Sequence, residues 1–146
     1  MLNINTVSET INNIKGHCYM TPKLTLTIAA IIGFIFSAIM FLAPGFVTEQ
    51  QFPLAEGQGY QDLVTLRYAI ASVIFALVAV TFQLRNIEGQ AFQSKVMLGY
   101  SVGFSVVCGT NIVLQLSGSV SAIPPIIGTG IIAVLSIVTW FKLKSK

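Results

Sequence analysis

Four long stretches of the chain are almost entirely apolar, and most polar residues lie between them. The stretches cover roughly 24–43, 63–84, 96–116 and 123–141. An α-helix needs about 20 mostly apolar residues to cross the hydrocarbon core of a bilayer. The period-two alternation typical of membrane β-barrels is absent from these stretches. The pattern therefore predicts an all-α integral membrane protein built as a four-helix bundle.

The segment before the first stretch has a different pattern. Between residues 4 and 14, apolar residues recur at spacings of three, four and three, which places them on one helical face. We expect residues 1–22 to form a short amphipathic helix on the cytoplasmic surface, followed by a transmembrane domain at 23–146. A frayed tail is the alternative for this segment.

Composition supports a membrane location. Hydrophobic residues make up 54% of the chain and charged residues 9%, whereas soluble domains carry roughly a quarter charged residues. The net charge of +3 does not indicate a nucleic-acid partner, because the basic residues flank the apolar stretches. The expected location is a cell membrane, which the protein crosses several times, with a bacterial inner membrane as the default.

The distribution of Lys and Arg predicts the orientation. The segment before the first stretch, the turn between the second and third, and the C-terminus hold all the basic residues except Arg67. The connections at about 44–62 and 117–122 contain no Lys or Arg. Both termini are therefore predicted to be cytoplasmic. The 44–62 loop is predicted to lie outside.

Small residues recur at helical spacing in every apolar stretch, most clearly as Gly99-x-x-x-Gly103 in the third. Because lipid tails are as apolar as leucine side chains, membrane helices associate closely where small residues let their backbones approach. We expect these faces to pack within the chain, with contacts between subunits as the alternative.

A single charged residue, Arg67, falls within the apolar stretches. A charge in a membrane helix costs a few kcal/mol near the bilayer centre and less near the surface, so a polar partner is expected. Asn111 and Gln115, one turn apart on one face of the third helix, fall at a similar depth. With Tyr68 and Asp62 nearby, these residues predict an outward-facing ligand-binding pocket for a carboxylate, a phosphate or a lipid headgroup.

Two other roles for Arg67 are open. The arginine can hold the 44–62 loop onto the helices through Asp62, Glu49 or Glu56. It can also contact a partner subunit. These structural roles and the ligand site predict different consequences of removing the guanidinium.

The residues of common catalytic and metal sites are missing. Cys18 and Cys108 form no C-x-x-C pair, and His17 is the only histidine. The helix cores hold no Asp, Glu or Lys, which removes the usual proton relay of coupled transporters. We expect no cofactor, no metal and no enzymatic activity.

The sequence "FLAPGFV", followed by "LRYAIASVIFALVAV" with its early arginine, resembles the broad DoxX-like group of small four-helix bacterial membrane proteins. The resemblance covers about residues 24–142 as a pattern of hydropathy. It implies an arginine facing the bundle interior, matched here by Arg67. Because that group is mostly uncharacterised, the resemblance implies an architecture rather than an activity.

These observations favour a non-catalytic accessory or assembly subunit of a membrane complex. Its expected partners are membrane lipids and either other membrane subunits or further copies of itself. The alternative is a protein that binds or transports a small molecule, an anion or a lipid through the pocket around Arg67.

Overall fold

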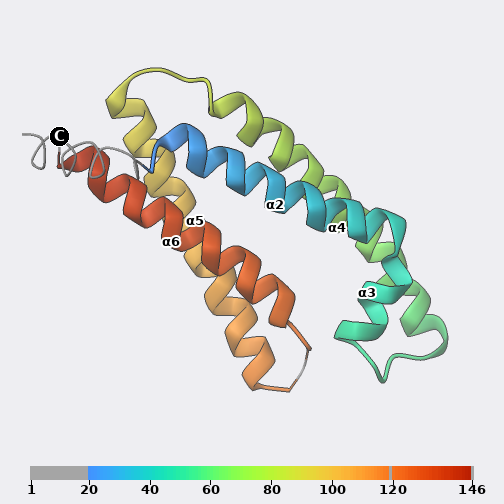
Figure 1. The fold of residues 1–146 in the computed structure, drawn as a ribbon. Coiled ribbons are helices and arrows are strands. Elements are labelled where there is room, and N and C mark those ends of the chain that lie inside the picture. Colours follow the sequence, from blue (N-terminus) through green and yellow to red (C-terminus); the bar gives the residue numbers. More distant parts are fainter. Residues whose placement is uncertain (1–19, 119, 146) are drawn as a thin grey trace, which may run out of the picture.

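The computed structural model describes residues 20–118 and 120–145, and this part of the chain is helical with no strand. Its helices are α2 (Pro22–Leu42), α3 (Pro44–Gln51), α4 (Gly57–Leu84), α5 (Gln90–Leu116) and α6 (Ile123–Lys144). The four longer helices are long and apolar enough to cross a membrane. The chain is therefore described as a multi-pass helical membrane protein (Figure 1).

The four long helices lie where the apolar stretches predict them, but each extends further at one end, α2 only by starting at Pro22 instead of 24. α4 begins at Gly57 instead of 63, α5 begins at Gln90 instead of 96, and α6 ends at Lys144 instead of 141. The added residues are largely polar. Hydropathy marks the part of a helix that fits the hydrocarbon, while the hydrogen-bonded helix continues beyond it. The amphipathic helix expected near the N-terminus lies outside the described residues.

The connection at 44–62 was expected to be a loop, but its first half is the helix α3. Ala43 alone separates α3 from α2, with φ −139° and ψ 55°. Pro44 explains this break, because a residue before proline is pushed out of the helical region. Proline is equally favourable at the first position of a new helix. The same residue therefore ends α2 and begins α3.

The long helices pack as two antiparallel pairs. In the first pair, Ser37 of α2 donates a hydrogen bond to the Ala71 carbonyl of α4 at 2.9 Å. In the second pair, the side chain of Gln90 at the start of α5 donates to the Leu143 carbonyl near the end of α6 at 2.6 Å. Figure 1 shows the pairs close together at one end and diverging toward the end that carries α3.

The two pairs meet mainly where α2 contacts α6. The hydroxyl groups of Thr25 and Thr139 lie 2.7 Å apart, and both residues are buried. Thr139 also donates to the Leu135 carbonyl, so Thr25 is the donor between the two hydroxyl groups. A second link joins α4 to α5, where the hydroxyl groups of Thr81 and Tyr100 hydrogen-bond.

The small-residue faces pack within the chain at some positions and not at others. A Cβ added at Gly33 would lie 2.7 Å from a methyl carbon of Val78, so α2 and α4 are in close contact there. In contrast, a Cβ added at Gly99, Gly103 or Gly109 of α5 would meet no described atom within 4 Å. The expectation that every small-residue face packs within the chain is therefore wrong for α5, whose buried side faces α6.

Candidate functional site

Arg67 is the only buried charged side chain in the described part of the chain, with 7% of its surface exposed. Ala71 lies one helical turn after Arg67, on the same side of α4, and is fully buried. α2 packs on this side of α4, since Ser37 bonds to the Ala71 carbonyl. The arginine therefore points toward the packed interior.

The nearest partner of the guanidinium is an aromatic ring. The Arg67 Cζ lies 5.5 Å from the centre of the Phe52 ring, directly after α3. The Arg67 Nε is fully buried and has no hydrogen-bond partner. Within residues 20–118 and 120–145, the guanidinium makes no hydrogen bond or ion pair. A cation over a ring is stabilised, but its N–H donors remain unpaired.

Two of the three acidic residues considered as partners bond elsewhere, and the third, Glu56, makes no bond to Arg67. Asp62 accepts a hydrogen bond from the Gln58 side chain at 2.8 Å. Glu49 accepts one from the Tyr60 hydroxyl at 3.1 Å. The 44–62 segment does contact Arg67, but it does so through the Phe52 ring. Tyr68, which follows the arginine, is partly exposed and stacks obliquely near Phe41 at 6.3 Å between ring centres.

The two amides proposed for the pocket bond within the other helix pair. Asn111 donates to the Val107 carbonyl at 2.8 Å, one turn back in α5. The Gln115 side chain accepts from the Ala122 amide at 2.6 Å and so holds the turn between α5 and α6. The adjacent Ser121 amide donates to the Gln51 carbonyl at the end of α3. α3 therefore bridges the two helix pairs at the end where Arg67 lies.

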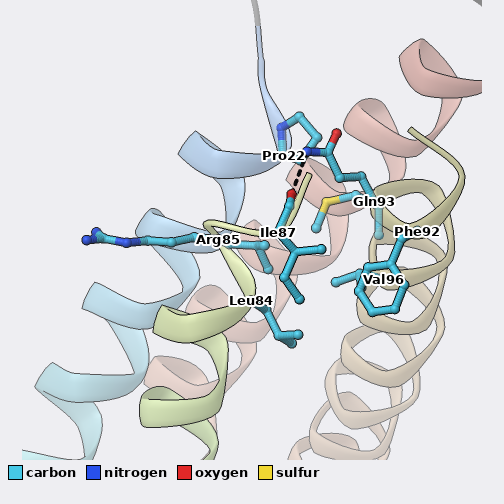
Figure 2. A pocket seen from close by; sticks show the side chains of 9 residues that line it. Pro22, Leu84, Arg85, Ile87, Phe92, Gln93 and Val96 are labelled. Atoms are coloured by element: carbon cyan, nitrogen blue, oxygen red, sulfur yellow. Dashed lines mark hydrogen bonds between the residues drawn. The ribbon is translucent and has the colours of Figure 1, made fainter. Parts of the chain in front are cut away.

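The opposite end of the molecule carries the other basic residues that the structure describes. Lys23 lies in the first turn of α2, Arg85 follows α4, Lys95 lies in α5, and Lys142 and Lys144 lie in the last turn of α6. A crevice at this end is lined by Pro22, Leu26, Arg85, Gln93 and neighbouring apolar residues, and it leaves no room for a water-sized molecule. Figure 2 shows the Arg85 side chain extending away from the other lining residues.

Within the described residues, no group of three or more His, Cys, Asp or Glu side chains is placed to hold a metal ion. The chemistry that the described part offers is therefore concentrated at Arg67. Sequence reasoning identified this residue but missed Phe52. Nothing in the spacing of Phe52 and Arg67 points to their contact, because the turn after α3 brings them together.

Comparisons with known proteins give no relative: no protein-family model, curated protein or solved structure matches the chain. They leave the resemblance to the DoxX-like group untested.

Proposed function

We propose that this protein is a non-catalytic accessory subunit of a membrane assembly, which packs on other membrane helices through the open face of α5. This face consists of Gly99, Val102, Gly103 and Val106. The observation that carries the proposal is the empty space beside Gly99 and Gly103. Val102 and Val106 beside them are well exposed.

Contact with lipid alone does not explain why this face contains two glycines. Glycine lowers the stability of a helix interior by about 1 kcal/mol relative to alanine. In membrane helices that cost is offset where two backbones approach closely. At Gly33 and Gly128 the chain itself supplies the approaching helix. At Gly99 and Gly103 a helix of another subunit, or of a second copy, would take that place.

The test is co-purification from the native membrane in mild detergent, comparing wild type with Gly103→Leu. The leucine fits the isolated chain, because nothing described lies within 4 Å. It would obstruct a helix packed on the open face, so we expect the associated chains to be lost while the monomer stays folded.

Ala79→Leu is the control. Ala79 is also exposed, but it lies on α4 and outside the open face of α5. It should leave the assembly intact. A wild-type protein that purifies alone, or identical particles from wild type and Gly103→Leu, would contradict the proposal. A bacterial inner membrane and a DoxX-like relationship are parts of the same proposal, and the identity of the co-purified chains would test the location.

A further inference from the structure

Arg67 combines burial with unmet hydrogen-bonding capacity. Its Nε is buried without a partner, and no described residue accepts a hydrogen bond from its terminal nitrogens. Those terminal nitrogens are not among the fully buried unpartnered atoms. They therefore keep access to the molecular surface, while the stem and Nε are enclosed. Buried arginine groups are normally paired, because an isolated charge in an apolar site is costly.

The surroundings of Arg67 suit the edge of a bilayer. Leu42 before α3 and Leu54 after it are 85% and 93% exposed, and Phe46 within α3 is also exposed. Large apolar side chains this exposed are stable where they contact acyl chains. The polar first turns of α4 precede the apolar run that begins at Leu63, only one turn before Arg67. The guanidinium is thus near the boundary between hydrocarbon and headgroups.

We propose that Arg67 binds the phosphate of a membrane phospholipid whose acyl chains lie against Leu42, Phe46 and Leu54. An arginine fork matches two phosphate oxygens and keeps its charge at any physiological pH. Two acidic residues of the neighbouring segment, Glu49 and Asp62, are bonded to Tyr60 and Gln58 instead. A free phosphate ion offers the same oxygens, so the experiment must separate a lipid from a soluble source.

Arg85 provides a matched comparison within the same chain. It too has a buried Nε without a partner and an aromatic ring beside it, with Cζ 3.5 Å from the centre of Phe82. Arg85 is only partly buried and lies at the opposite end of α4. Its charge can be solvated by water. Removing it should leave the site at Arg67 intact.

The experiment measures lipid binding by native mass spectrometry of the full chain in detergent, with phosphatidylglycerol as the probe. Wild type, Arg67→Gln, Arg67→Lys and Arg85→Gln are compared. We expect roughly tenfold or greater loss of affinity in Arg67→Gln, because a charge-assisted contact is removed. Arg67→Lys should bind with intermediate affinity, since it keeps the charge without the fork. Arg85→Gln should bind like wild type.

A second measurement uses wild type alone, so that it does not depend on whether a variant folds. Diacylglycerol with the same acyl chains lacks the phosphate and should bind much more weakly than phosphatidylglycerol. If millimolar inorganic phosphate displaces phosphatidylglycerol and stabilises the lipid-free protein against heat, Arg67 does bind phosphate, but the ligand is the free phosphate ion. If it does neither, the source is the lipid.

Two results would overturn the proposal. One is equal binding of phosphatidylglycerol and diacylglycerol to wild type. The other is unchanged phosphatidylglycerol binding in a folded Arg67→Gln variant. A partner chain retained through Arg67, with no preference for the phosphate-bearing lipid, would also overturn it in favour of a carboxylate on that partner. None of these results depends on the open face of α5, so the two proposals succeed or fail separately.

Discussion

At the scale of single residues, the glycines divide into two groups that should respond oppositely to the same substitution. A Cβ added at Gly128 of α6 would lie 2.8 Å from Cε2 of Phe36 and 3.2 Å from its Cζ. These contacts are shorter than van der Waals separation, so the Phe36 ring or α2 must shift to accept the added methyl group. Gly99 has no described neighbour within 4 Å.

We therefore expect Gly128→Ala to destabilise the protein by about 1–3 kcal/mol through overpacking. Gly99→Ala should be neutral or stabilise by up to about 1 kcal/mol, because alanine is the better helix former. Reversible unfolding of the detergent-solubilised monomer, followed by circular dichroism, measures both changes. Equal effects of the two substitutions would mean that the contact between α2 and α6 is not as close as the structure places it.

The residue scale also shows what a sequence pattern can and cannot identify. Arg67 is recognisable because a charge among apolar residues needs a partner. The identity of that partner is not recognisable. Two nearby carboxylates, Asp62 and Glu49, are bonded to Gln58 and Tyr60, and the guanidinium lies beside an aromatic ring instead. Side-chain pairing across a turn depends on the backbone path of that turn, which hydropathy and spacing do not encode.

At the scale of elements, the presence of a long helix was easier to predict than the residues at which it begins and ends. The four long helices follow from their apolar runs, while α3 was missed because its eight residues, PGFVTEQQ, have no sustained apolar run. Pro44 follows the first apolar stretch and ends α2. The structure shows that it also starts the next helix, which carries the chain from the first helix pair toward the turn between α5 and α6.

The docking of α3 depends on Phe52, and this leads to a prediction. Replacing the ring by leucine keeps an apolar side chain but removes the interaction with the Arg67 cation. A desolvated cation–ring contact is worth about 1–2 kcal/mol, so Phe52→Leu should lower stability by about that amount. Phe82→Leu is the control, because its partner Arg85 is more exposed and the expected loss is below about 1 kcal/mol.

Reversible unfolding of lipid-free protein in detergent measures both losses. A loss in Phe52→Leu that persists unchanged when Arg67 is replaced by methionine would show that the ring acts by packing alone. In that case the cation would have no stabilising partner in the described part of the chain. The contact between Phe52 and Arg67 would then need another explanation.

At the scale of the whole molecule, the pairing of helices could not be predicted. α4 and α5 are consecutive and joined by a short turn, yet the extensive contacts are between α2 and α4 and between α5 and α6. Small residues mark where a helix can be approached closely, but every long helix has them. The choice of partner depends on how complementary two faces are in three dimensions, as at Ser37 and Ala71.

The arrangement does bring the described basic residues to one end, and the last prediction concerns the side of the membrane on which that end lies. Helix ends meet there, and at or near these ends lie Lys23, Arg85, Lys95, Lys142 and Lys144. Because cytoplasmic loops are enriched in Lys and Arg, we expect this end inside and α3 outside.

Single cysteines at Gln58 and Ser145, introduced after replacing Cys18 and Cys108, test this orientation in intact cells. Both positions are exposed. A membrane-impermeant maleimide should label Gln58→Cys directly and Ser145→Cys only after permeabilisation. The reverse pattern would invert the topology. It would also place Arg67 at the inner leaflet, where the same phosphate chemistry would meet a different set of lipids.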